Sequence, residues 1–367
     1  MVREIGVREI EDIATGAAVL GTGGGGDPHV GKLMALQAVT ECGPVKLIDL
    51  DDVPDDALLM PLAMMGAPTV LVEKIPNGAE FPAAYDALKN YLGKDVYATM
   101  PIEAGGVNSM IPLASAARLG IPVVDADGMG RAFPELQMVT FHLCGVKATP
   151  MVMTDEKGNT LLLNTVNNNW TEAIARAATV VMGGSAMIAI YPMTGAQAKA
   201  GGIRRVVTLC QRIGEVIREA KIQRRDPVSA VLEVTGGFEL FKGKITDVSR
   251  RTVGGFARGE ATFEGMDGYK GRTMKVEFQN ENLIATCDGE VWASVPDLIT
   301  VLDAETARPI TTEGLRYGYR AVIIGIPCDS KWRSPAGIAT VGPRYFGYDV
   351  DYVPVEQRLA ERGGALR

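Results

Sequence analysis

The stretch GTGGGGDPHVGK, residues 21–32, decides which fold the N-terminal half of the chain adopts. Three of its glycines, Gly21, Gly23 and Gly26, match the G-x-G-x-x-G fingerprint of dinucleotide-binding folds. That fingerprint requires a strand before the glycines and a helix after them. The residues before this run are patterned as a helix instead, because apolar residues recur on one face: Ile10, Ile13, Ala14, Ala17 and Ala18. The sequence therefore predicts two helices joined by a glycine turn.

The residues after the glycines also lack the features of a phosphate loop. Asp27 is placed as the N-cap and Pro28 as the first residue of a helix that runs to about Cys42. The Asp27 carboxylate complements the dipole at this helix N-terminus and would repel a bound phosphate. Lys32 lies six residues past Gly26, outside the GK[ST] frame of a phosphate-binding loop. Nucleotide binding is therefore disfavoured.

A run of glycines nevertheless leaves backbone amides open to a ligand. Glycine adopts positive φ readily, and successive amides in such a turn line a concavity. Four consecutive glycines cost chain entropy, which makes a pure connector less favourable. We predict that the loop binds a small planar polar substrate through Thr22, Gly23, Gly24, Gly25 and Gly26. The alternative is a tightly packed turn between two helices.

Beyond the second helix, strand-like and helical segments alternate. Strands are expected over 45–50, 57–66 and 121–124, and helices over 81–93 and 108–120. This alternation predicts an α/β fold in which a mainly parallel sheet is flanked by helices on both faces. After about residue 140 the pattern changes to extended segments and two further helices.

The chain becomes strand-like from about residue 228. The segment TMKVEF, residues 273–278, alternates between apolar and polar side chains, which is typical of an antiparallel sheet with one buried face. We therefore predict two domains, with the boundary near 224–230. Residues 1–227 would form the α/β domain that carries the glycine-rich loop and the site acids. Residues 228–367 would form a mostly antiparallel β domain.

Composition excludes several classes of protein. The net charge of −7 argues against a nucleic-acid partner, which requires a basic face. No apolar run reaches the ~18 residues of a membrane span, and the N-terminus lacks the apolar core of a signal peptide. Five scattered cysteines form no CxxC pair. We expect a cytoplasmic protein with reduced thiols and no membrane partner, and a homo-oligomer stays open.

Candidate catalytic acids follow the predicted strands, where open α/β sheets bind their ligands. The loop PIEAGGVNS carries Glu103 and Asn108, and the loop DADGMGRAFPE carries two aspartates, an arginine and a glutamate. Two carboxylates close together raise the pKa of one of them, which suits acid–base work. The predicted catalytic residues are Asp127, Glu103, Asp125 and Glu135, and the predicted substrate-binding residues of these loops are Asn108 and Arg131. The alternatives are a turn residue at Asp127 and a solvated loop acid at Glu103.

Metal binding stays undecided. In the segment FHLCG, His142 and Cys144 are expected on one side of a strand, and they are the only candidate pair for a metal. With only two histidines in the chain, a three-histidine site is excluded. The competing interpretation is a hydrogen-bonded core histidine beside a buried thiol. The cofactor is therefore unknown, and a divalent metal is one option.

Three long motifs resemble a known family. They are GTGGGGDP at residues 21–28, DADGMGRAFPELQM at 125–138, and GLRYGYRAVIIGIPCDSKWRSP at 314–335, which VGPRYFGYDVDYVPVE follows at 341–356. These motifs resemble the S-methyl-thiohydantoin desulfurase family, formerly a domain of unknown function and linked with hydantoinases and oxoprolinases. The resemblance covers nearly the whole chain. It implies that the glycine loop and the 125–137 segment are site motifs.

The family implies hydrolysis of a small cyclic substrate. A hydrolase of this kind would remove sulfur from a five-membered thiohydantoin ring. From the residues, we expect Asp127 or Glu103 to be the base that activates water, and Asp125 or Glu135 to be the acid or a positioning partner. A metal-bound hydroxide held by the histidine–cysteine pair is the variant mechanism. Two other functions stay open: ATP-dependent ring opening of the hydantoinase or oxoprolinase kind, and non-catalytic binding of a small ligand.

Overall fold

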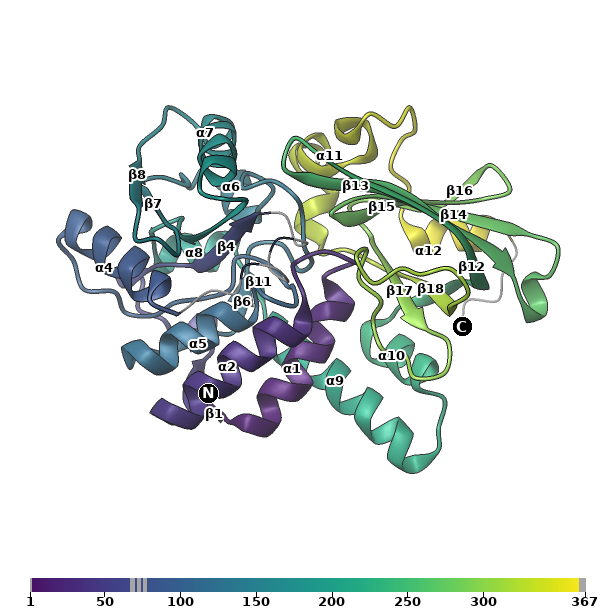
Figure 1. Cartoon of the computed structure of the whole chain (residues 1–367), viewed down its shortest axis with the longest axis horizontal. Helices are drawn as coiled ribbons and strands as arrows, with labels where there is room; N and C mark the ends of the chain where they lie inside the picture. The colour runs from purple at the N-terminus through teal and green to yellow at the C-terminus, as the bar shows by residue number, and fades with distance from the viewer. Residues whose placement is uncertain (1, 67–69, 71–73, 75–77, 363–367) are drawn as a thin grey trace.

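A computed structural model describes residues 2–66, 70, 74 and 78–362. Figure 1 shows a two-domain layout, in which helices and small sheets of the N-terminal part lie beside a large sheet of the C-terminal part. Within the described residues, no helix is both long and apolar enough to cross a membrane.

The glycine run joins two helices, as predicted. Helix α1 (Val7–Leu20) precedes it and helix α2 (Pro28–Cys42) follows it. The Asp27 carboxylate caps α2, because its Oδ1 accepts hydrogen bonds from the amides of His29 at 2.7 Å and Val30 at 3.4 Å. The strand that a dinucleotide fingerprint requires is therefore replaced by a helix.

The N-terminal sheets are small and mixed, so the prediction of a mainly parallel sheet is wrong. In one sheet β2 (Val45–Ile48) pairs antiparallel with β1 (Arg3–Ile5) and parallel with β5 (Val123–Val124). A second sheet has the order β4-β9-β7-β8 and is antiparallel throughout. Its strands are β4 (Leu62–Gly66), β9 (Ser185–Ala189), β7 (Met151–Thr154) and β8 (Thr160–Leu163).

The strand direction changes because residues 185–204 return to pair with earlier segments. Strand β9 inserts between β4 and β7 and runs antiparallel to both. Two short strands do the same with other segments, as β10 (Met193–Thr194) pairs with β3 (Leu58–Leu59) and β11 (Ile203–Arg204) pairs with β6 (Ala126–Asp127). A local alternation of helix and strand does not encode such long-range pairings.

Further helices pack around the sheets (Figure 1). They are α4 (Glu80–Leu92), α5 (Met110–Leu119), α6 (Thr140–Leu143), α7 (Asn168–Val181), α8 (Gly195–Gly201), α9 (Val206–Gln223) and α10 (Pro227–Thr235). The last of them, α10, packs on α9 and on the C-terminal sheet. Helix α9 packs closely on α1, since a Cβ at Gly16 would lie 1.8 Å from the Cys210 carbonyl oxygen. The predicted helices over 81–93 and 108–120 are confirmed as α4 and α5, and each ends at a glycine in the left-handed conformation.

The C-terminal half confirms the predicted antiparallel domain. Among the described residues, seven strands form a half-barrel sheet with the order β16-β15-β14-β13-β12-β18-β17. The strands are β12 (Phe238–Val253), β13 (Phe256–Gly265), β14 (Thr273–Gln279), β15 (Glu281–Cys287), β16 (Glu290–Ser294), β17 (Leu298–Asp303) and β18 (Arg320–Ile326). In β14 the alternate residues Met274, Val276 and Phe278 are buried, as the sequence predicts.

Short elements complete the chain. They are η1 (Leu50–Asp52), η2 (Asp267–Tyr269), η3 (Ser330–Arg333), α11 (Pro335–Val341), η4 (Pro343–Phe346) and α12 (Val355–Glu361). The largest core cluster draws buried side chains from both halves, from Ile5 to Val341. The domain boundary at 227/228 stays a prediction.

Candidate active site

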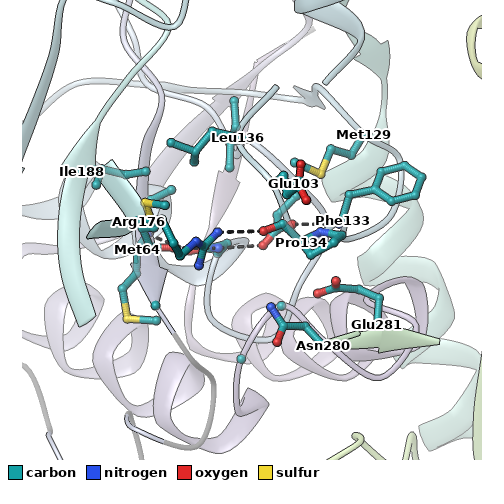
Figure 2. Close-up of a pocket in the computed structure, with 18 residues that line it drawn as sticks. Met64, Glu103, Met129, Phe133, Pro134, Leu136, Arg176, Ile188, Asn280 and Glu281 are labelled. Carbon is teal, nitrogen blue, oxygen red and sulfur yellow. Dashed lines mark hydrogen bonds between the residues drawn. The ribbon is translucent and has the colours of Figure 1, made fainter. Parts of the chain in front are cut away.

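The glycine run and residues 129–136 both contribute to the lining of one cavity, so these two motifs meet. About 620 Å³ of space lies between its walls, including open solvent at the mouth. It is lined by Gly25, Gly26, Ala63, Met64, Met65, Gly66, Ile102, Glu103, Asn108, Met129, Phe133, Pro134, Glu135, Leu136, Arg176, Ile188, Asn280 and Glu281. In Figure 2, Glu281 and Asn280 lie along one side, and Arg176, Met64 and Ile188 lie on the opposite side. The cavity is therefore built from both halves of the chain.

The glycine run is divided between ligand access and close packing. Gly25 and Gly26 have positive φ angles of 73° and 85° and present backbone to the cavity. A Cβ at Gly25 would lie 2.5 Å from the Gly105 Cα, so no larger residue fits there. Thr22, Gly23 and Gly24 do not line the cavity.

Those three residues instead bind the C-terminal half. The Thr22 carbonyl accepts a hydrogen bond from the Asn282 amide at 2.8 Å, and the Gly23 carbonyl accepts one from the Thr312 amide at 2.9 Å. At Gly24, a Cβ would lie 2.0 Å from a Glu281 carboxyl oxygen. The loop therefore divides: Gly25 and Gly26 are open to a ligand, whereas residues 22–24 pack against the C-terminal half.

Glu103 is a buried acid in the cavity wall, rather than a solvated loop acid. Its Oε1 accepts a hydrogen bond from the Asn108 amide at 2.6 Å, and its Oε2 accepts one from the Phe133 amide at 3.3 Å. Burial raises the pKa of Glu103 to about 7, although these two hydrogen bonds and the Arg131 charge act in the opposite direction. A carboxyl with this pKa exchanges protons readily near neutral pH.

Asn108 holds Glu103 in place and is itself fixed by the backbone. Its Oδ1 accepts a hydrogen bond from the Met64 amide at 2.8 Å, and its Nδ2 also donates to the Met64 carbonyl at 3.2 Å. The side chain therefore spans from β4 to the Glu103 loop at the cavity wall. Its shortest hydrogen bond is to the acid, so it orients Glu103 and has little free hydrogen-bonding capacity for a substrate.

Glu281 is a second buried acid that the sequence analysis missed. It follows Asn280, whose φ of 58° turns the chain between β14 and β15, and it lines the cavity. Its Oε2 is buried and finds no hydrogen-bond partner among the described residues. Burial raises the pKa of Glu281 well above its usual value, and the nearby charge of Glu103 raises it further. The available signal was QNEN at 279–282, a polar run between two apolar strands.

Asp127 and Asp125 do not reach the cavity. The Asp127 side chain is fully buried, and its Oδ1 accepts hydrogen bonds from the amides of Met129 at 3.1 Å and Gly130 at 2.8 Å. Burial raises its pKa well above the usual value. Asp125 accepts hydrogen bonds from the amide and hydroxyl of Thr208 on α9. The two acids organise the turn and its contact with α9.

Arg131 is a buried structural residue. Its guanidinium donates to the carbonyls of Asp297 at 2.7 Å and Asn282 at 3.2 Å, and to the Thr22 hydroxyl at 2.9 Å. It also lies 4.3 Å from the centre of the Phe133 ring. Since it is fully buried and outside the cavity lining, Arg131 connects the glycine run to the C-terminal half and does not reach a substrate.

Glu135 and Arg176 line the cavity but already have partners. Glu135 Oε2 accepts hydrogen bonds from the Tyr345 hydroxyl at 2.6 Å and from the Gln137 amide at 2.5 Å. Arg176 donates to Glu172 at 2.7 Å and to the Pro134 carbonyl at 2.8 Å. Of the predicted acids, Glu103 and Glu135 are therefore brought to one cavity.

The candidate metal pair lies on and just after a short helix rather than on a strand. His142 belongs to α6, and its Nδ1 is 3.0 Å from the Asn168 amide nitrogen, while Cys144 is exposed rather than buried. Across the described part of the chain, no three His, Cys, Asp or Glu side chains are grouped so that they could hold a metal ion. The pair therefore gains no further ligand here.

Cys328 lies in the loop after β18, residues 327–335. It is buried, and its backbone amide donates a hydrogen bond to the Asp297 side chain.

This cavity of buried carboxyls, enclosed by two domains, is the kind of site in which a small ligand meets acid–base groups. The N-terminal part, residues 8–165, matches the model of the S-Me-THD-like N-terminal domain. Residues 166–355 match the model of the S-Me-THD-like C-terminal domain. The chain therefore belongs to the S-Me-THD-like family, as its motifs predicted. This membership is consistent with a thiohydantoin-related function and suggests an enzyme.

The fold also occurs in a solved structure. A crystal structure of a protein from Chromobacterium violaceum is similar with a TM-score of 0.81 and 23% sequence identity, covering 96% of this chain and 100% of that one. At this identity the similarity shows the fold alone. No curated protein matches the chain at a significant level.

Proposed function

We propose that the chain hydrolyses a small thiohydantoin-type ring and releases its exocyclic sulfur as a thiol. The observation that carries this proposal is Glu103, a buried carboxyl with a pKa of about 7, in one cavity with a second buried carboxyl, Glu281. Membership of the S-Me-THD-like family supports the choice of ring.

Two coupled acids in one cavity divide the roles of base and acid. Like charges nearby resist simultaneous ionisation, so near neutral pH one carboxyl is ionised and the other keeps its proton. Glu103 accepts two hydrogen bonds that favour its ionised form, whereas the Glu281 Oε2 has no partner within the described residues. We therefore assign Glu103 as the base and Glu281 as the acid.

The reaction balances with these two groups and one water. Glu103 removes a proton from water as the water oxygen bonds to the ring carbon that carries sulfur. Glu281 protonates the adjacent ring nitrogen, which receives the electrons of the C=N bond. The tetrahedral adduct then expels the thiolate with the C–S electron pair, and the remaining hydroxyl proton passes to sulfur as the carbonyl forms. The proton on Glu103 finally returns to Glu281.

The rest of the cavity suits a compact ring. Its apolar walls come from Met64, Ile102, Met129, Phe133 and Leu136. Apolar walls exclude water from the reacting atoms, which strengthens the electrostatic effect of the two acids. The backbone at Gly25 and Gly26 allows a flat ring to approach without a side chain in the way.

The proposal is tested by incubating the purified chain with S-methylated and unmodified thiohydantoins, without nucleotide or added metal. We expect release of methanethiol or hydrogen sulfide, measured with a thiol reagent, and formation of the corresponding hydantoin. Strict dependence on ATP and magnesium would instead support ring opening of the oxoprolinase kind. Saturable binding without turnover on every ring tested would support a ligand-binding protein.

A further inference from the structure

A second cavity lies on the C-terminal sheet and is not used by the proposed reaction. About 1060 Å³ of space lies between its walls, including open solvent at the wide mouth, and β12, β13, β14 and the segment around η4 line it. We propose that this cavity binds a small anionic molecule whose carboxylate or phosphate group is held by Arg251 and Arg258. This inference does not depend on the proposed desulfuration.

The two arginines lie side by side on adjacent strands of the sheet. Arg251 of β12 pairs in register with Arg258 of β13, and Arg258 pairs in register with Gln279 of β14. Side chains directly opposite on antiparallel strands have Cβ atoms roughly 5 Å apart, and like charges in such pairs are destabilising. Three nitrogen-rich side chains therefore form a row across three strands, and all three line the cavity.

Neither arginine has an acidic partner in the part of the chain that the structure describes. Other arginines of the same sheet do have one, as Arg272 pairs with Asp288 at 2.7 Å and Arg320 pairs with Glu305 at 2.8 Å. A repulsive pair that lacks compensation within the chain is explained if an external anion supplies it. The planar fork of arginine binds carboxylate and phosphate through two parallel hydrogen bonds.

The two acids that line the cavity share one basic partner. Glu260 and Glu277 form the next row of the sheet, and both contact Lys275, at 2.6 Å and 3.5 Å. Burial raises the pKa of Tyr348, and the nearby charge of Glu277 raises it further. Lys275 offsets one of the two negative charges, so the two arginines keep a surplus of one positive charge for a ligand.

The remaining lining residues suit a small organic anion. Ser249 pairs in register with Glu260 and lies two residues from Arg251, on the same face of β12. Its hydroxyl adds a donor beside the arginine row, and Phe346 adds an apolar surface. Gln279 immediately precedes Asn280 and Glu281, so this site adjoins the catalytic cavity through the turn between β14 and β15.

The test compares the R251Q/R258Q variant with the wild-type chain, and the R8Q/R212Q variant serves as a control with the same loss of charge. Arg8 and Arg212 are exposed on α1 and α9, outside both cavities. Binding of inorganic phosphate and of succinate is measured separately by calorimetry and by thermal denaturation, at constant ionic strength. The two probes distinguish a phosphate from a carboxylate ligand.

We expect at least one probe to bind the wild-type chain and the control saturably, and to bind R251Q/R258Q at least tenfold more weakly. In anion-free buffer, R251Q/R258Q should denature at the same or a higher temperature than the wild-type chain, because the repulsion is removed. Absence of saturable binding to the wild-type chain, or equal binding to R251Q/R258Q, would overturn the proposal. So would a clear loss of stability in R251Q/R258Q, since the arginines would then be structural.

Discussion

Two buried carboxyls in neighbouring loops, Glu103 and Asp127, differ in their access to the cavity. Burial raises the pKa of both groups, and both accept hydrogen bonds from backbone amides. Glu103 lines the first cavity, whereas Asp127 closes its own turn and lines neither of the two cavities described above. A raised pKa therefore indicates a buried acid, and access to a substrate is what makes such an acid a candidate for catalysis. The predictions below test this difference.

The largest expected effect is that of E103Q. Glutamine keeps the size of the side chain and can still accept from the Phe133 amide, but it removes the base. Loss of a positioned base costs ~10²–10⁴ in rate, so kcat for thiol release should fall within that range. Near-normal turnover by a folded E103Q protein, checked by circular dichroism, would remove Glu103 from the mechanism.

E281Q should have a smaller effect. The leaving thiolate is a good leaving group, so the acid helps only the ring nitrogen, and we expect kcat to fall about ten- to a hundredfold. A substrate whose reacting ring nitrogen is alkylated, and therefore already cationic, needs no proton from Glu281. For that substrate E281Q should lower kcat less, which steady-state kinetics on the alkylated and unalkylated rings will show. Equal losses on both substrates would contradict the assignment of Glu281 as a proton donor to nitrogen.

Substitution in the glycine run should act on stability. G25A places a Cβ 2.5 Å from the Gly105 backbone at a positive φ of 73°, so the free energy of unfolding should fall by ~1–3 kcal/mol or more. G93A is the matched control, because Gly93 has a φ of 63° but no atom within 4 Å of the added Cβ. Urea denaturation should show a larger loss for G25A than for G93A, and equal losses would refute close packing as the cause.

The smallest effect is expected for D127N. Its Oδ1 can still accept from the amides of Met129 and Gly130, and the new amide is neutral, as burial favours for the carboxyl by raising its pKa. We expect kcat within a factor of about 5 of the wild-type value, and the free energy of unfolding within ~1 kcal/mol. A loss of activity as large as that of E103Q would show that Asp127 reaches the reaction after all.

The sequence predicted the parts of the fold that local patterns encode. The helix–glycine–helix arrangement follows from the apolar spacing before Gly21 and from Asp27 and Pro28 after the run. The C-terminal antiparallel sheet follows from alternation such as that in residues 273–278. The direction of the N-terminal strands did not follow, because β9 reaches its partners β4 and β7 only through long-range pairing.

Part of the candidate site was also predictable from the sequence. Loop position after a strand identified Glu103, Asn108 and Glu135, which do line the cavity. The same reasoning chose Asp125 and Arg131, because sequence spacing does not reveal that a side chain turns inward to bond Thr208 or the C-terminal half. Glu281 was missed since it comes from the other domain.

The most direct test of Glu103 as the base is the pH dependence of kcat/KM for thiol release. Burial raises the pKa of Glu103 to about 7, and a base acts only when deprotonated, so kcat/KM should rise with pH and level off above about 7. In E103Q this rise should be absent from the residual activity. A rate that is flat between pH 5 and 8 in the wild-type chain, or a rise that persists in E103Q, would contradict the account.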